Sequence, residues 1–91
     1  MQNNLNNEVK SKVIQAISEI TGFDEEDITM DSSLEEDIGV DMIQTFPKIM
    51  QNLNQNMDNQ LPLRNIDFVN ELKYADTVGE LVEVIKSEVE F

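Results

Sequence analysis

Residues 31–43 read Asp-Ser-Ser-Leu-Glu-Glu-Asp-Ile-Gly-Val-Asp-Met-Ile and contain five acids but no base. The apolar residues of this stretch, and of the residues just before it, do not recur at the spacing of a helix. A segment of this length without regular structure inside a compact domain is usually functional or disordered. Because apolar residues punctuate it, we predict a long ordered loop over residues 22–40, held to the core by Phe23, Ile28, Met30, Leu34, Ile38 and Val40.

The residues before this loop predict a helix over about residues 7–21. Their apolar positions recur every three or four residues, at Val9, Val13, Ile17 and Ile20. Asn7 is the expected N-cap, followed by Glu8 in the first turn, where the helix dipole favours an anion. Gly22 is expected at the left-handed position that follows the helix.

The residues after the loop predict a second helix, which Asp41 opens. Its apolar stripe comprises Ile43, Phe46, Met50, Leu53 and Met57, and the pattern places Ile43 in the core. Pro47 falls inside this stripe, so either the helix is kinked or its regular part starts later. Residues 51–60 contain seven Asn or Gln residues, so we expect the helix to fray there.

The C-terminal third predicts two more helices after a break at Leu61-Pro62-Leu63. A short helix is expected over about 65–73, from Ile66, Val69 or Phe68, and Leu72. Thr77 and Glu80 form a capping box, which opens a last helix over about 77–89 with apolar positions at Val78, Leu81, Val82, Ile85 and Val89. The predicted fold is therefore all-α, a bundle of three longer helices and one short helix, with Val13, Ile17, Phe46, Met50, Leu81 and Ile85 in its core.

Length and composition bound the function. The chain has 91 residues and a formal net charge of −13, without Cys or His. We expect a polar tail over residues 1–7 and a single domain over residues 8–91. The charge argues against nucleic acid as a direct ligand, and the missing residue types argue against a zinc or iron–sulfur site and a Ser-His or Cys-His nucleophile. We expect no dedicated metal site. No apolar run is long enough for a membrane span, and we expect a cytoplasmic monomer.

Ten acids and no base lie between Glu19 and Asp41. This run is interpreted as a solvated acidic loop or as a surface for a basic partner, since complementary charge speeds association. An EF-hand is excluded, because Ile28 and Thr29 occupy the fifth and sixth places of the twelve residues from Asp24.

The stretch Ser33-Leu-Glu-Glu-Asp-Ile-Gly-Val-Asp41 resembles the acidic loop of acyl carrier proteins, which has the form S-x-x-E-D-L-G-x-D-S-L and leads into the second helix. Three further pieces resemble the same family in order: the turn from Gly22 to Thr29, the break at Leu61-Pro62, and the last helix from Thr77 to Val82. The resemblance covers roughly residues 8–89 and implies the four-helix fold of that family. It also implies a serine that bears 4′-phosphopantetheine, on which the acyl chain is held as a thioester.

The sequence departs from the family at that serine. The triplet that matches Asp-Ser-Leu is Asp41-Met42-Ile43, and methionine cannot form the phosphodiester. Ser33, the closest upstream serine, lies nine residues before Met42. Helix two also departs, because residues 42–57 contain no acid and one base, Lys48, whereas family members usually present acids there to basic enzyme surfaces. The segment from Pro62 to Thr77 is longer than is usual in the family.

We therefore predict a carrier-like domain related to fatty-acid or polyketide biosynthesis that has no cofactor at Met42. It is not an enzyme, and it acts as a docking or scaffolding module for synthase or acyltransferase components with a basic surface. The expected docking residues are Asp37, Asp41, Met42, Gln44 and Lys48. Two alternatives stay open: a functional carrier modified with 4′-phosphopantetheine at another serine, and an unrelated acidic helical adaptor that binds a basic protein.

Overall fold

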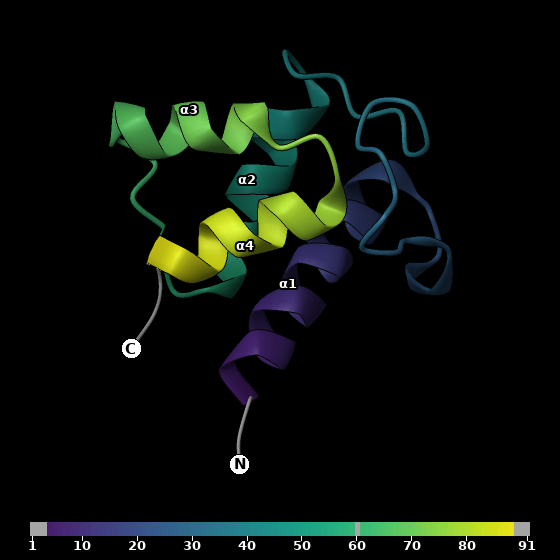
Figure 1. Ribbon diagram of the computed structural model, residues 1–91, viewed down its shortest axis with the longest axis horizontal. Helices are drawn as coiled ribbons and strands as arrows, with labels where there is room; N and C mark the ends of the chain where they lie inside the picture. The colour runs from purple at the N-terminus through teal and green to yellow at the C-terminus, as the bar shows by residue number, and fades with distance from the viewer. Residues whose placement is uncertain (1–3, 60, 89–91) are drawn as a thin grey trace.

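The computed structural model describes residues 4–59 and 61–88 of the chain. Within these residues it contains four α-helices, one 3-10 helix and no strand longer than a single bridge between Ser33 and Thr77 (Figure 1). The elements are α1 (Asn4–Thr21), η1 (Glu25–Asp27), α2 (Thr45–Asn56), α3 (Ile66–Tyr74) and α4 (Val78–Glu88). The prediction of an all-α bundle with three longer helices and one short helix is confirmed.

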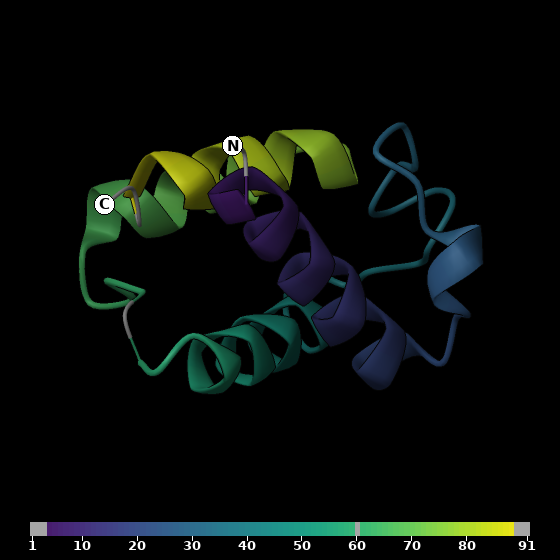
Figure 2. The same cartoon turned by 90° about the horizontal axis from the view of Figure 1, so that it is seen from below.

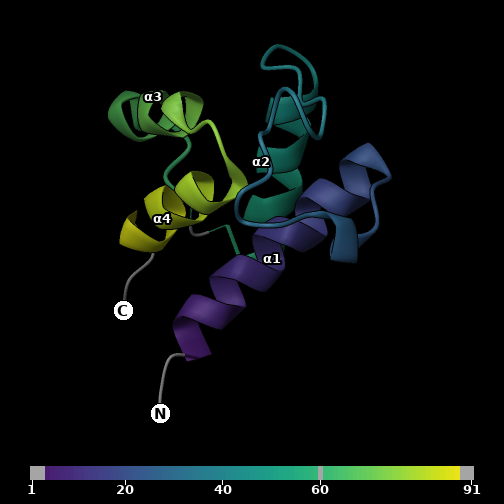
Figure 3. The same ribbon diagram turned by 45° about the vertical axis from the view of Figure 1, so that its right-hand side comes forward.

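Helix α1 joins the two parts of the bundle. It packs against both α2 and α4, and α3 packs on α4. Figure 2 shows α2 on one side of the molecule and the α3–α4 pair on the other, with α1 crossing both. The long connection between α1 and α2 lies at one side, away from the C-terminal end of α4 (Figures 1 and 3).

The core forms where these helices meet. All six residues predicted for it are buried, with relative exposure of 5% or less: Val13, Ile17, Phe46, Met50, Leu81 and Ile85. Burying a side chain of this size stabilises the fold by roughly 1.5–3 kcal/mol. The helical periodicity therefore identified the residues that hold the bundle together.

Helix α1 begins at Asn4, one turn earlier than predicted, so the assignment of Asn7 as its N-cap was wrong. The apolar stripe marks only the part of a helix that packs, and Asn is a weak helix former rather than a breaker, so the backbone continues beyond the stripe. The other end is as predicted: Gly22 has φ +86° and its N–H donates to the Ser18 carbonyl at 2.9 Å. The part of the predicted tail over residues 1–3 lies outside the described residues.

The connection from Gly22 to Gln44 is an ordered loop that includes η1, as predicted for residues 22–40. Four of its expected apolar anchors are buried, namely Ile28, Leu34, Ile38 and Val40, and Met30 is half-buried. Phe23 was wrongly placed among the anchors, because it is 38% exposed. It directly follows the left-handed turn at Gly22, where the chain leaves the bundle.

Backbone hydrogen bonds fasten this loop to the start of α4. Leu34 N–H donates to the Asp76 carbonyl at 2.9 Å, and Val78 N–H donates to the Ser32 carbonyl at 3.1 Å. Gly79 N–H donates to the Met30 carbonyl at 2.9 Å, and a Cβ at Gly79 would lie 3.0 Å from that carbonyl oxygen. The close approach of two backbones therefore favours a residue without a side chain at Gly79, since a Cβ there would push the Met30 carbonyl away by a few tenths of an ångström.

Helix α2 begins at Thr45 and not at Asp41. Pro47 consequently lies in its first turn, where a backbone N–H has no carbonyl partner within the helix, so the later-start interpretation of Pro47 is confirmed. The helix ends at Asn56, and Asp58 and Asn59 then adopt positive φ values of 57° and 60°. The end falls within the Asn-rich and Gln-rich segment where fraying was predicted; Gln60 lies outside the described residues.

The last two helices are capped by side chains. Asn65 Oδ1 accepts the N–H of Asp67 at 2.9 Å, which starts α3. Its first residue, Ile66, is 73% exposed and Phe68 is buried, so the choice between Val69 and Phe68 resolves to Phe68 and Ile66 was wrongly placed on the packed stripe. The short stripe did not reveal that this first-turn residue next to the cap is exposed.

Helix α4 opens on the predicted capping box in modified form. Thr77 Oγ1 accepts Glu80 N–H at 3.2 Å, while Glu80 Oε1 accepts the N–H of Asp76 at 2.8 Å and not that of Thr77. The box therefore fixes one more residue of the α3–α4 connection than its usual form does. Val89, the last residue of the predicted stripe, lies outside the described residues.

Candidate functional site

The site is the turn Asp41–Gln44, which joins the acidic loop to α2. Asp41 shapes this turn twice: its Oδ1 accepts Ile43 N–H at 2.7 Å, and its backbone carbonyl accepts Phe46 N–H at 2.8 Å. A short acidic side chain that bonds the backbone two residues on is typical of turns. Asp41 therefore holds the chain out of helical geometry until Thr45, and Met42 lies ahead of the regular helix.

Ile43 is the main correction to the predicted site. It was assigned to the core, but 84% of its surface is exposed. The stripe that predicted its burial assumed helical geometry from Asp41 onward, and residues 42–44 form a turn instead. The buried series of α2 starts at Phe46 and continues through Ile49, Met50 and Leu53. Ile43 is thus a large apolar side chain presented at the surface.

Met42 is half-buried and packs against the edge of the core. It lines two hollows. One, of about 490 Å³, lies between α2 and α3 and is mostly apolar, with walls that include Phe46, Met50, Val69 and Leu72. The other, of about 390 Å³, lies toward the acidic loop and the α3–α4 connection, and it includes Glu35, Glu36 and Asp76. Met42 therefore forms part of the wall between an apolar space and an acidic one.

Lys73 is a residue of this site that the sequence did not reveal. It lies in the last turn of α3 and lines both hollows together with Met42. The sequence signal for Lys73 was its position next to Leu72. Because Leu72 is buried, its neighbours along α3 lie at the edge of the packed face, where the two hollows open. The structure thus places a cation close to the residue that the sequence singled out.

The predicted docking residues are exposed except for Met42, and two of them also have structural roles. Asp37 Oδ2 accepts Ser33 N–H at 2.8 Å, and Asp41 forms the turn described above. Gln44 and Lys48 are exposed and one helical turn apart at the start of α2. The structure therefore groups Asp41, Met42 and Gln44 in one turn, next to Lys48 on the first turns of the helix.

The acidic loop and α2 differ in their electrostatics. The first turn of α2 contains no acid, whereas the exposed acids lie in η1 and in the loop around residues 35–41. Across the described parts of the chain, the ion pair found is Lys86 with Glu83 at 3.4 Å. The loop carboxylates therefore face solvent without a cationic side-chain partner among the described residues.

The serines near Met42 have hydroxyls that already make hydrogen bonds. Ser32 is 9% exposed, and its Oγ lies 3.0 Å from the Thr29 hydroxyl. Ser33 is half-buried, lines the acidic hollow with Met42, and accepts Glu36 N–H on its Oγ at 3.1 Å. Ser33 is thus the serine that shares a space with Met42.

In residues 4–59 and 61–88, no three His, Cys, Asp or Glu side chains converge as metal ligands would. None of the described helices combines the length and the apolar character that crossing a membrane requires.

The comparison with known proteins assigns the family. The chain is 33% identical over 81 residues to the acyl carrier protein of Borrelia garinii subsp. bavariensis, and the match covers 89% of this chain and 92% of that protein. No protein-family profile and no solved structure matches the chain. An identity of this level over about nine-tenths of both sequences shows that the chain belongs to the acyl carrier protein family.

Proposed function

We propose that this protein is a carrier-like domain without 4′-phosphopantetheine at the usual position, and that it acts as a docking or scaffolding module in fatty-acid or polyketide biosynthesis. The observation that carries the proposal is Met42, which stands between Asp41 and Ile43 where the resemblance puts the attachment serine. A thioether has no hydroxyl, so it does not fit a phosphodiester-linked group. The protein is then a cytoplasmic binding partner and not an enzyme.

The surroundings of Met42 support docking. An unbranched methionine adapts to irregular partner surfaces, and the neighbouring Ile43 adds an apolar side chain that is 84% exposed. Exposed Gln44 and Lys48 continue this surface onto α2. We therefore propose that the docking surface comprises Asp37, Asp41, Met42, Ile43, Gln44 and Lys48.

The charges of this surface favour a basic partner that approaches from the loop side. Asp37 and Asp41 keep exposed carboxylates although each also accepts a backbone N–H. Complementary charges at the rim of an interface accelerate association and fix its orientation. A synthase or acyltransferase component with a basic surface would supply the charges that complement Asp37 and Asp41.

The test is mass spectrometry of the natural protein after incubation with coenzyme A and a phosphopantetheinyl transferase of broad specificity. A carrier protein with an intact Asp-Ser-Leu triplet serves as the positive control in the same tube. We expect full modification of that control and no mass gain on this protein. A complete mass gain on the natural protein would overturn the proposal.

A carrier modified at a different serine is the second candidate, and one observation favours Ser33 for it: Ser33 lines the same hollow as Met42. If the natural protein gains mass, peptide mapping locates the modified residue. Ser33→Ala should then abolish the gain, whereas Ser11→Ala, on the exposed side of α1, should leave it unchanged. The third interpretation, an adaptor unrelated to carriers, is excluded by the family assignment.

A further inference from the structure

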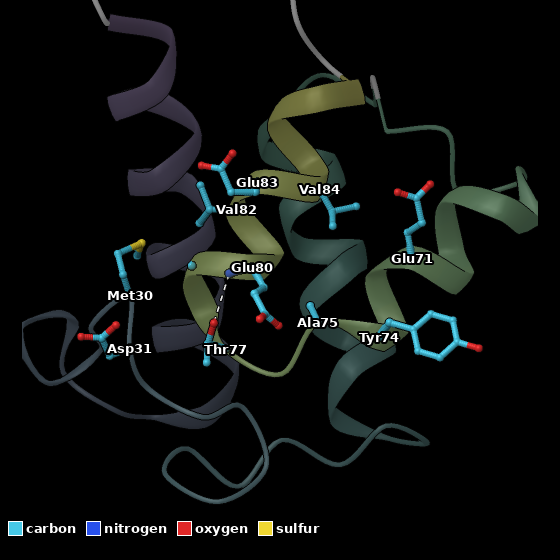
Figure 4. A pocket seen from close by; sticks show the side chains of 11 residues that line it. Met30, Asp31, Glu71, Tyr74, Ala75, Thr77, Glu80, Val82, Glu83 and Val84 are labelled. Carbon is cyan, nitrogen blue, oxygen red and sulfur yellow. Dashed lines mark hydrogen bonds between the residues drawn. The ribbon is translucent and has the colours of Figure 1, made fainter.

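A third hollow lies on the outer surface of α4, away from α2. It has a volume of about 740 Å³, and three segments line it: the loop at Met30–Asp31, the end of α3 with Ala75, and the first two turns of α4 (Figure 4). Residues from Met42 to Gln51 do not line it. It is therefore a different surface from the one proposed above, and it shares only Ala75, on the α3–α4 connection, with the acidic hollow beside Met42.

The inner part of this hollow is apolar. Ala75 and Val82 are buried, Met30 and Val84 are half-buried, and all four contribute to its lining. Tyr74 lies at the α3 side of the hollow in Figure 4, and 83% of its surface is exposed. Exposed aromatic rings of this kind are enriched where proteins bind each other.

The rim of the hollow is acidic. Asp31, Glu71, Glu80 and Glu83 line it, and none of its described lining residues is Lys or Arg. Figure 4 shows these carboxylates on both sides of α4, with Asp31 near the loop and Glu71 on α3.

The acids of the rim differ in what they already bind. Glu80 accepts a hydrogen bond from the Asp76 N–H, and Glu83 forms an ion pair with Lys86. The carboxylates of Asp31 and Glu71 make no hydrogen bond or ion pair with the other described side chains or backbone groups. These two carboxylates are therefore open to cations from another molecule.

We propose that this hollow binds a basic amphipathic helix of a partner protein. Such a helix carries one apolar row flanked by Lys and Arg rows. The apolar row would lie over Val84 and Tyr74, and the basic rows would face Asp31 and Glu71. The carboxylates disfavour nucleic acid and anionic lipid as occupants, and the apolar floor gives a free metal cation no ligands.

This second surface goes beyond the proposed function, because it involves neither Met42 nor the acids of residues 35–41. It gives the domain two separate faces, so one partner at Met42 and another at α4 can be bound together.

The experiment uses Tyr74 as a local reporter. The chain contains one tyrosine and no tryptophan, so its tyrosine emission comes from the rim of this hollow. The probe is a synthetic amphipathic helical peptide of Leu and Lys without aromatic residues, titrated into the whole protein at about 0.1 M salt to screen distant charges. We expect a saturable change in Tyr74 emission.

Two charge-matched double variants separate the hollow from the general acidity of the chain. Asp31→Asn with Glu71→Gln removes two charges from the rim, and we expect affinity to fall roughly fivefold or more. Glu25→Gln with Glu26→Gln removes two exposed charges from η1, and we expect a change of about twofold or less at this ionic strength. Equal losses in the two variants would show general charge attraction and overturn the proposal.

Two further arms complete the test. A peptide of the same composition in scrambled order, without an apolar row, should bind at least about fivefold more weakly. Equal affinity for both peptides, no binding, or binding seen by calorimetry without a change in Tyr74 emission would each overturn the proposal. None of these results depends on Met42, so they are independent of the mass-spectrometry test of the proposed function.

Discussion

The acidic loop and α2 are adjacent in sequence, but they are built in opposite ways. The loop from Gly22 to Gln44 has little regular structure and is fixed by buried apolar anchors and by backbone bonds to the start of α4. Helix α2 is regular, packs through one buried stripe, and exposes a face of Gln and Asn without acids and with one cation, Lys48. The charge of this part of the molecule therefore lies on the irregular segment and not on the helix.

A docking surface needs side chains that are held in fixed positions and charges that attract the partner, and this part of the molecule provides the two in different ways. The loop supplies charge, and its anchors keep the carboxylates in place without cationic partners among the described residues. The turn at Asp41 then presents Met42 and Ile43 between the acidic segment and the helix without acids. Four measurements test this division.

The largest effect is expected from loss of a loop anchor. Leu34 is 1% exposed, so Leu34→Ala should lower the free energy of unfolding by about 2–5 kcal/mol. Ile43→Ala, at a position that is 84% exposed, should change it by less than about 0.5 kcal/mol. Urea unfolding of both variants measures the two values. Similar losses would contradict the view that the loop is anchored and the turn is free.

The contact between the loop and α4 gives the next effect. Gly79→Ala places a Cβ about 3.0 Å from the Met30 carbonyl oxygen, so we expect a loss of roughly 1–3 kcal/mol. An ordinary helical Gly→Ala substitution stabilises by about 1 kcal/mol. Asn70→Ala, on the exposed side of α3, is the control and should not destabilise. A more stable Gly79→Ala protein would show that the loop is not held against α4.

A third measurement converts the helix without acids toward an acidic one. Met42→Ser restores a hydroxyl before Ile43, and we expect slow, partial loading by a phosphopantetheinyl transferase. Adding Gln44→Glu and Lys48→Glu should raise the loading rate by about tenfold, because acids on α2 would complement the kind of basic enzyme surface that family members usually meet there. The rate is followed by mass spectrometry.

The control for this measurement adds Gln15→Glu and Lys10→Glu on α1 to Met42→Ser, which gives the same change of charge elsewhere. Rapid loading of Met42→Ser alone would show that the docking surface is intact and that only the hydroxyl was lost.

The smallest effect concerns repulsion within the loop. Its exposed carboxylates repel each other, and salt near 0.1 M or millimolar divalent cations should screen them. We expect the melting temperature to rise by a few degrees, since about 1 kcal/mol corresponds to roughly 4–8 °C in a domain of this size. Glu25→Gln with Glu26→Gln should reduce the response. If the melting temperature does not change from low to high salt, the loop carboxylates are too far apart to repel each other measurably, and the prediction is wrong.

The sequence by itself determined the parts of the fold that depend on local pattern. Apolar spacing located four helices and six core residues, and Gly22 and Thr77 marked an end and a start. The same sequence placed Met42 in the triplet where the resemblance requires a serine. These conclusions hold because helical periodicity, caps and the presence of a hydroxyl are properties of neighbouring residues.

The tertiary structure alone decided where the regular helix starts and which distant residues meet. Ile43 fits the apolar spacing of α2, but the Asp41 turn removes it from the helix and leaves it exposed. Lys73 lines the same two hollows as Met42, and Tyr74 borders the hollow over α4, because α3 packs on α4. Periodicity gives the face of a helix, whereas the neighbours of that face are set by packing between segments far apart in the chain.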